Sequence, residues 1–241
     1  MNIKDIEKSI IKKFRKEIWS QFVKAIKDYK LITDNDKIAV CISGGKDSFL
    51  LAKCMQEIIK HGKMNFELEF IVMNPGYKKE HLDNIISNAE LLNIPIKIFN
   101  TDIFEVSDFL NSEKPCYMCA RMRRGYLYNF AKELGCNKIA LGHHFDDAIE
   151  TTLLNMFYCG EFKTMMPKLK STNHPGMELI RPMIKISERD IITYMNYCEI
   201  KALGCACKVS EGVVDSQRKE MKEFIVELRK KYPIADKCRE R

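Results

Sequence analysis

The sequence predicts an α/β protein with a doubly wound parallel sheet, and three observations lead to this prediction. First, the apolar, β-branched run at residues 38–42 breaks into Ser-Gly-Gly and is followed at once by apolar residues at helical spacing. Second, short apolar runs and helical patterns alternate along residues 36–200, which is typical of a parallel sheet covered by helices on both faces. Third, 241 residues of 46% hydrophobic composition can bury a substantial core. Ligands of such folds bind at the carboxyl ends of the strands.

The first part of the chain begins with an amphipathic pattern and then alternates strands with helices. The elements expected before residue 101 are a helix over 3–31, interrupted or continuous, a strand over 38–42, a helix through Leu50 and Ile58, a strand over 67–73, a helix over 79–92 and a strand over 96–100. The turn residues Asp34, Asn35 and Asp36 separate the first helix from the first strand. The other face of that helix is basic, which fits either a solvated surface or a contact with tRNA.

The second part continues the alternation after an irregular stretch that ends at Pro115. The expected elements are a helix over 116–134, a strand over 138–141, a helix over 146–159, a long loop over 160–178, a strand over 179–181, a helix over 191–198 behind a Ser187 cap, and a last helix over 215–231. A Cys-rich loop precedes the last helix, and a basic tail follows it. The sequence therefore predicts three parts: a helical segment over 1–35, a nucleotide-binding domain over 36–200 and an appendage over 201–241.

Composition limits the class of protein. No apolar run approaches the roughly 18 residues of a membrane-spanning helix and no signal-peptide core is present, so we expect a cytoplasmic protein without a membrane partner. Cytosolic thiols stay reduced, so the ten cysteines are not expected to form disulfides. Five of them lie in apolar segments and are expected in the core: Cys41, Cys54, Cys136, Cys159 and Cys198. The net charge of +7 fits polyanion binding or a merely lysine-rich composition.

The turn after the first strand has the chemistry of an anion site. Its residues are Ser43, Gly44, Gly45, Lys46, Asp47 and Ser48. Glycines let the backbone approach a ligand closely, and the N–H groups and dipole of the following helix favour negative charge. The spacing differs from that of the common nucleotide-binding P-loop, G-x-x-x-x-G-K-[ST].

Two pairs of cysteines suggest a metal centre. Cys116 and Cys119 lie three residues apart at a predicted helix start, where both thiolates can face one metal. Cys205 and Cys207 offer a third ligand and a fourth. Four thiolates suit zinc, whereas three leave an iron–sulfur cluster with an open iron, and spacing alone does not choose between them.

The run from Gly142 to Thr151 follows the strand at 138–141 and contributes polar groups to the same edge of the sheet. Asp146 and Glu150 are four residues apart and share a helix face, which suits Mg²⁺ or a polar contact near phosphates, with Asp147 beside them. His143 or His144 could be a zinc ligand, although no second histidine follows four residues later. Acidic residues in a first helical turn also simply complement the helix dipole.

Cations flank this proposed site on both sides. They are Arg121, Arg123, Arg124, Lys163, Lys168, Lys170 and Arg181. Some suit the phosphates of ATP and others an RNA backbone.

Several segments, in this order, closely resemble the tRNA 2-thiocytidine synthetase (TtcA-like) family of PP-loop ATP pyrophosphatases. The matching segments are 43–48, 116–125, 142–151, 155–158 with 166–169, and 180–182. The resemblance implies the adenine nucleotide alpha hydrolase-like fold. It also implies an ATP-dependent sulfurtransferase that adenylates the C2 oxygen of a cytidine in the tRNA anticodon loop, replaces that oxygen with sulfur, and releases AMP and pyrophosphate.

The resemblance also assigns roles to residues. It implies catalytic roles for Lys46, Asp47, Cys116, Cys119 and Asp146, and ATP contacts for residues 43–48, Gly142, His143 and Asp147. A [4Fe-4S] cluster is implied on Cys116, Cys119 and Cys205. Cys207 is the alternative third ligand, because the later pair is spaced Cys-x-Cys where the family has C-x-x-C. Mg²⁺ is expected with ATP.

The expected partners are tRNA and a sulfur donor, either a cysteine desulfurase or free sulfide, with a homodimer left open. Three other functions remain: thiolation of a uridine or a small molecule, desulfuration, and an amide-forming ligase on the same fold. A zinc-bearing RNA-binding module is the alternative that is not an enzyme.

Overall fold

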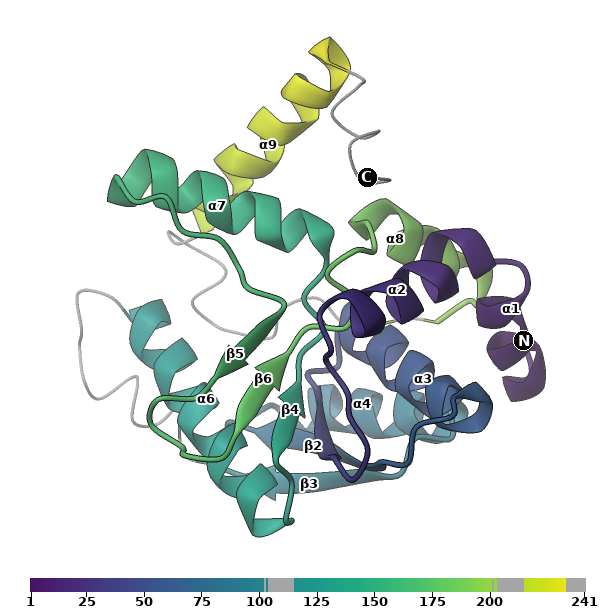
Figure 1. Ribbon diagram of the computed structural model, residues 1–241. Coiled ribbons are helices and arrows are strands. Elements are labelled where there is room, and N and C mark those ends of the chain that lie inside the picture. Colours follow the sequence, from purple (N-terminus) through teal and green to yellow (C-terminus); the bar gives the residue numbers. More distant parts are fainter. Residues whose placement is uncertain (102, 104–114, 201, 203–214, 233–241) are drawn as a thin grey trace.

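A computed structural model describes residues 1–101, 103, 115–200, 202 and 215–232 of the chain. Its centre is a six-stranded sheet with the order β3-β2-β1-β4-β6-β5. The strands are β1 (Lys37–Ile42), β2 (Glu67–Asn74), β3 (Ile96–Asn100), β4 (Lys138–Ala140), β5 (Lys168–Lys170) and β6 (Glu178–Ile180). All neighbours are parallel except β5, which pairs antiparallel with β6. The predicted doubly wound parallel sheet is therefore confirmed, with one antiparallel edge strand (Figure 1).

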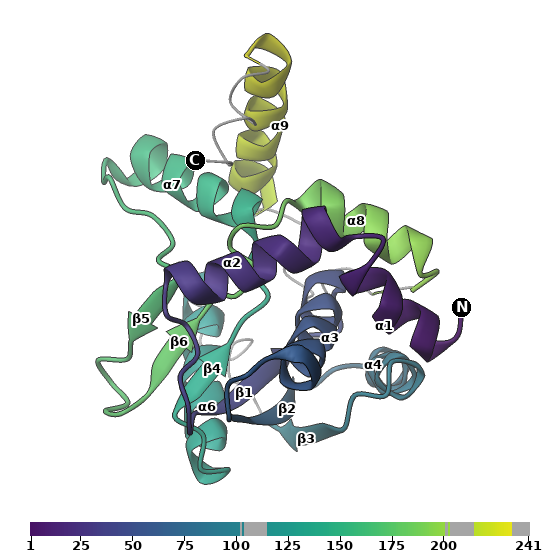
Figure 2. The same ribbon diagram turned by 45° about the vertical axis from the view of Figure 1, so that its right-hand side comes forward.

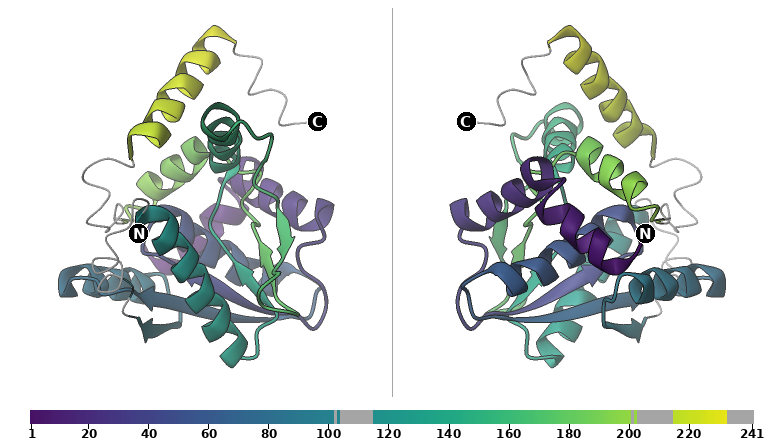
Figure 3. Two further views of the ribbon diagram at one scale, coloured as in Figure 1. Left: turned by 90° about the vertical axis from the view of Figure 1, so that its left-hand side faces the viewer. Right: turned by 90° about the vertical axis from the view of Figure 1, so that its right-hand side faces the viewer.

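Helices cover both faces of the sheet. They are α1 (Ile3–Ile11), the π-helix η1 (Arg15–Trp19), α2 (Ser20–Asp28), α3 (Lys46–His61), α4 (Lys79–Leu91), α6 (Pro115–Glu133), α7 (Phe145–Cys159), α8 (Glu188–Tyr197) and α9 (Asp215–Lys231). Figure 3 shows α6 against one face of the sheet and α1, α2 and α3 against the other. No helix in the described part of the chain is both long enough and apolar enough to cross a bilayer.

The alternation of side chains along β1 explains the two faces. Ile38, Val40 and Ile42 belong to the larger buried cluster, which the N-terminal helices, α3, α4 and α8 share. Ala39 and Cys41 point to the opposite face, where they join the buried residues of α6. Successive residues of a strand face opposite sides, so one apolar run serves both layers.

The N-terminal segment is part of this core. Its apolar residues Ile6, Ile10, Phe14, Ile18, Phe22 and Ile26 are all buried in the larger cluster. The predicted helix is interrupted, as the sequence allowed, because α1 and α2 flank the π-helix η1. In Figure 2, α2 and α8 lie above α3 and α1 lies to its right. Phe14 contacts Tyr194 of α8 edge-on, with the ring centroids 5.3 Å apart. The division into 1–35, 36–200 and 201–241 stays a prediction.

Two sequence predictions are wrong. Residues 168–170, expected within a loop, form the edge strand β5. Three residues with one apolar side chain are too short to show an alternating pattern, and pairing with β6 stabilises the strand. Cys159, expected in the core, is exposed at the end of α7, whereas Cys41, Cys54, Cys136 and Cys198 are buried as predicted.

Candidate active site

The turn between β1 and α3 is built for an anion. Gly44 has φ +84°, and a Cβ there would lie 2.7 Å from Cγ1 of the buried Ile85, so only glycine fits. The Ser48 hydroxyl donates to the carbonyl of Gly45 at 2.8 Å and accepts from the N–H of Ser43 at 3.2 Å. These bonds fix the turn and leave the first N–H groups of α3 at the carboxyl edge of the sheet.

Lys46 and Asp47 lie at the start of α3, where the Lys46 ammonium contacts two carboxylates. Lys46 Nζ is 3.2 Å from Asp47 Oδ2 and 3.0 Å from Glu188 Oε1. Burial alone lowers the pKa of Lys46, but the two carboxylates outweigh it and raise this pKa above its usual value. Burial raises the pKa of Asp47 despite its cationic neighbours, and its buried Oδ1 has no hydrogen-bond partner among the described residues. A buried oxygen without a hydrogen-bond partner is a candidate contact for a bound ligand.

The loop after β4 packs directly onto this turn. A Cβ on Gly142 would lie 3.1 Å from the carbonyl carbon of Asp47 and 3.2 Å from the backbone nitrogen of Ser48. The buried His144 caps α7, accepting the N–H of Asp147, while the Asp147 carboxylate accepts the N–H of His144. The two loops therefore hold each other in place.

His143 is a neutral acceptor in this loop. Its Nδ1 accepts from Arg181 Nε at 3.3 Å. Burial and the Arg181 charge lower the pKa of His143 to about 4. Burial likewise lowers the pKa of Arg181 to about 10, which leaves it cationic at neutral pH.

A cavity of about 540 Å³ lies where the two loops meet. Its lining comes from the end of β1 and the turn into α3, the end of β2 and the loop after it, helix α6, the loop after β4 with the first turn of α7, and the end of β6 with the residue after it. The lining residues include Ser43, Asp47, Ser48, Met73, Tyr77, Arg123, Arg124, Gly142, His143, Asp147 and Arg181. Three guanidinium groups thus share one cavity with two carboxylates and a helix N-terminus. This combination suits a ligand that carries phosphates together with an apolar ring.

Asp146 and Glu150 are turned away from this cavity. Asp146 Oδ2 accepts the N–H of Glu188 at 2.7 Å, and Oδ1 pairs with Arg229 at 2.6 Å. These contacts outweigh burial and lower the pKa of Asp146, whereas burial raises the pKa of Glu150, which lies 3.7 Å from Lys222. Mg²⁺ binding by Asp146 and Glu150 stays a prediction, and Asp147 is the carboxylate of α7 that reaches the cavity.

The cysteine pair begins the helix that lines the cavity. Cys116 and Cys119 fall in the first turns of α6, and Arg123 follows Cys119 by four residues, about 6 Å along the axis. Cys205 and Cys207 lie outside the described residues. Within the described ranges, no group of three or more His, Cys, Asp or Glu residues could hold a metal.

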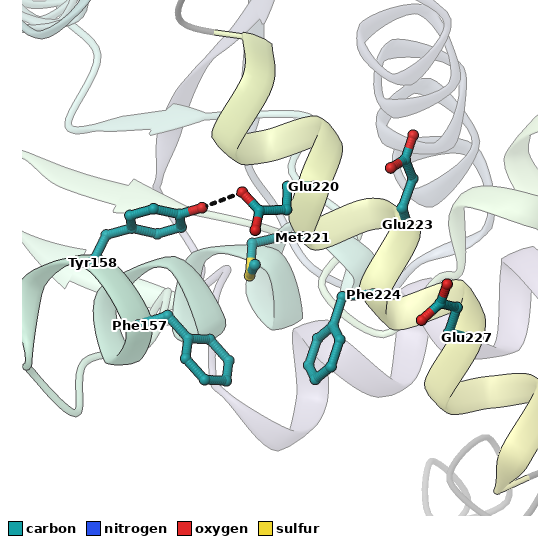
Figure 4. A pocket seen from close by; sticks show the side chains of 7 residues that line it. All are labelled: Phe157, Tyr158, Glu220, Met221, Glu223, Phe224 and Glu227. Carbon is teal, nitrogen blue, oxygen red and sulfur yellow. Dashed lines mark hydrogen bonds between the residues drawn. The ribbon is translucent and has the colours of Figure 1, made fainter.

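Helix α9 packs on α7 beside the site. Phe157 meets Phe224 edge-on at 5.8 Å and the Tyr158 hydroxyl donates to Glu220 (Figure 4). The groove between the two helices measures about 520 Å³. Sequence reasoning missed Glu188, Lys222 and Arg229 as neighbours of the site. For Lys222 and Arg229 the sequence offered one signal: their seven-residue spacing puts both on one helix face.

Comparisons with known proteins agree with this geometry. A family model described as a PP-loop domain matches residues 14–203. The tRNA-cytidine(32) 2-sulfurtransferase of Geobacter sulfurreducens is 36% identical over 222 residues, which cover 90% of this chain and 85% of that one. The enzyme of the same name from Acinetobacter baylyi is 36% identical over 230 residues, covering 93% and 73%.

Among solved structures, the U34-tRNA thiolase NcsA from Methanococcus maripaludis, with its [4Fe-4S] cluster, superposes with a TM-score of 0.72. It is 24% identical, and the match covers 91% of this chain and 75% of NcsA. This likeness supports the fold.

Proposed function

The chain belongs to the PP-loop family of tRNA-cytidine 2-sulfurtransferases, and on this premise we propose that it uses ATP to thiolate a cytidine of tRNA. In the first step the C2 oxygen of the base attacks the α-phosphorus of ATP, and pyrophosphate leaves. In the second step sulfur attacks C2, the C2–O bond breaks, and AMP leaves. An amide-like oxygen is a poor leaving group, and adenylation replaces it with a good one.

The observation that carries this proposal is the meeting of two loops at one cavity. The turn at residues 43–48 offers backbone N–H groups, while Gly142 of the opposite loop lies against its backbone. The cavity of about 540 Å³ is of ordinary size for a small-molecule site. We assign ATP to this cavity, with the turn on its phosphates and Arg181 beside them.

Two side chains suit the adenylation step. The Lys46 ammonium would neutralise charge on the departing pyrophosphate. Asp47 lines the same cavity, and its buried Oδ1 has no hydrogen-bond partner among the described residues. His143 is uncharged at neutral pH, so it accepts a hydrogen bond from Arg181 and orients that guanidinium. Mg²⁺ is proposed to accompany ATP, near Asp47 and Asp147.

We propose that Cys116, Cys119 and Cys205, with Cys207 as the alternative third residue, hold a [4Fe-4S] cluster. Cys116 and Cys119 are three residues apart in the sequence of α6, a spacing typical of cysteines that ligate one cluster. When bound by these cysteines, such a cluster would supply the sulfur for the second step. Helix α6 would connect this centre to the cavity, because it begins with the two cysteines and its Arg123 and Arg124 line the cavity.

The remaining partners follow from the reaction. Cytidine is expected as part of tRNA, and the sulfur comes from a cysteine desulfurase or from free sulfide. We place the reaction in the cytoplasm and propose a homodimer as the assembly to be tested by light scattering.

The test is a reaction in vitro with anaerobically purified protein, Mg-ATP, sulfide and unmodified tRNA. We expect one pyrophosphate released per thiocytidine formed, and a rate of thiocytidine formation lowered by about two to three orders of magnitude in the Lys46→Ala variant. Lys63→Ala, at an exposed lysine before β2 at the opposite edge of the sheet, is the matched control and keeps full activity. Pyrophosphate release with free amides but not with tRNA would contradict the proposal and favour an amide-forming ligase.

A further inference from the structure

Lys46 directly precedes Asp47, which lines the ATP cavity, and its ammonium lies between Asp47 Oδ2 at 3.2 Å and Glu188 Oε1 at 3.0 Å. Glu188 comes from α8, 142 residues further along the chain. The lysine of the anion-binding turn is therefore placed by an element that the nucleotide-binding motif does not contain.

Glu188 is itself fixed at the start of α8. Its backbone N–H donates to Asp146 Oδ2 at 2.7 Å, which ties α8 to the first turn of α7. Its second carboxylate oxygen, Oε2, lies 3.5 Å from Lys222 Nζ of α9. One carboxylate thus bridges two lysines, one in the turn and one in the C-terminal helix.

Helix α9 is seated well enough to fix Lys222. Met221 and Ile225 on either side of it are buried. Phe224 contacts Phe157 of α7, and Figure 4 shows both rings between the two helices. Arg229, two turns further along, pairs with Asp146 at 2.6 Å. Apolar packing and a second ion pair therefore hold the helix that carries Lys222.

The charges explain why such a bridge is useful. A free lysine side chain has about 2 kcal/mol of rotamer entropy, which an anchored ammonium has already lost. A carboxylate close to the phosphates would repel them unless a cation offsets it. Lys222 supplies that cation for Glu188.

We propose that Glu188 is a positioning residue for adenylation, which holds the Lys46 ammonium while Lys222 offsets its charge. The inference rests on the proposed function, and it makes α9 a part of the ATP site. Because Lys46 acts on charge that develops as pyrophosphate leaves, losing its position lowers kcat more than it changes KM for ATP. Losing Lys222 instead leaves Glu188 with Lys46 alone to offset its charge, so the region beside the ATP site becomes more negative and ATP binding weakens.

The first experiment measures tRNA-dependent pyrophosphate release. We expect Glu188→Gln, which keeps the shape and removes the charge, to lower kcat about tenfold with KM for ATP within about twofold. In a Lys46→Met background the same substitution is expected to cause no further loss, because Glu188 acts through Lys46. The control is Glu199→Gln, two residues past the end of α8, where the side chain is 82% exposed and pairs with the N-terminal amine. Equal losses from Glu188→Gln in both backgrounds, or no loss in either, would overturn the proposal.

The second experiment measures ATP binding by calorimetry and needs no tRNA. Lys222→Met is expected to weaken binding several-fold in the wild-type background and to have a much smaller effect in the Glu188→Gln background, where only its contact with Glu150 at 3.7 Å remains to be lost. Additive effects would overturn the proposal even if tRNA turned out not to be the substrate. A protein that binds ATP with this coupling but releases no pyrophosphate with tRNA would contradict the proposed function and leave the inference standing.

Discussion

The close approach of Gly142 to the anion-binding turn provides a sharp test of the site. In Gly142→Ala the new methyl group would lie 3.1 Å from both the carbonyl carbon and the carbonyl oxygen of Asp47, and 3.2 Å from the nitrogen of Ser48. These are backbone atoms at the start of α3, so no side chain can rotate away. The backbone at Gly142 is one that alanine adopts, and the penalty is therefore purely one of space.

The size of the effect follows from this overlap. Van der Waals contact begins near 3.4 Å, so the turn must move by a few tenths of an ångström. Inserting a methyl group into a packed site costs about 1–3 kcal/mol. If the moved turn no longer presents its N–H groups to phosphate, that cost appears in ATP affinity as a factor of about 5 to 150.

The assay compares two glycines by ATP calorimetry and thermal unfolding. Gly125→Ala, in the middle of α6, is the control, because a Cβ there meets nothing within 4 Å. We expect it to bind ATP normally and to be as stable as the wild type or slightly more so, since alanine favours helix. An unchanged ATP affinity and melting temperature in Gly142→Ala would refute the claim that the two loops form one nucleotide site.

Three further predictions follow from the same geometry. Gly44 has φ +84° and a Cβ there would lie 2.7 Å from Ile85, whereas Gly176 has the similar φ of +83° with open space around it. Both alanine variants are strained, but urea unfolding should show the larger loss of stability for Gly44→Ala. Equal losses in the two variants would contradict the contact with Ile85. His143 has its pKa lowered to about 4, so the unfolded chain binds a proton more readily between that value and about 6.5. Stability therefore falls on acidification through this window, and His143→Gln should lose less stability than the wild type between pH 7 and pH 5; equal losses would count against a buried neutral imidazole. Anaerobically purified protein should contain iron and labile sulfide that Cys116→Ala loses, and zinc alone would contradict the cluster.

The sequence predicted those parts of the fold that local patterns encode. The run from Ile38 to Ser48 specified a strand, a turn and a helix, because β-branched residues, glycines and helical spacing each act within a few residues. Both the turn and the loop at Gly142 were correctly placed at the carboxyl edge of the sheet. The edge strand β5 was missed because its stability comes from pairing with β6.

The site was predicted less completely, since its ion pairs join distant segments. Asp146 and Glu150 were expected near phosphates because they share one face of α7. That face is covered by α8 and α9, and the neighbouring Asp147 reaches the cavity instead. Only the docking of α9 reveals that Glu188 bridges Lys46 and Lys222, and no local pattern encodes that docking.

The most direct test of the proposed function is mass spectrometry of tRNA nucleosides from a strain that lacks this gene, compared with its parent. We predict that 2-thiocytidine disappears and returns with the intact gene, but not with Lys46→Ala or Cys116→Ala. An unchanged thionucleoside profile, or the loss of a thiouridine alone, would contradict the assignment of cytidine in tRNA as the substrate.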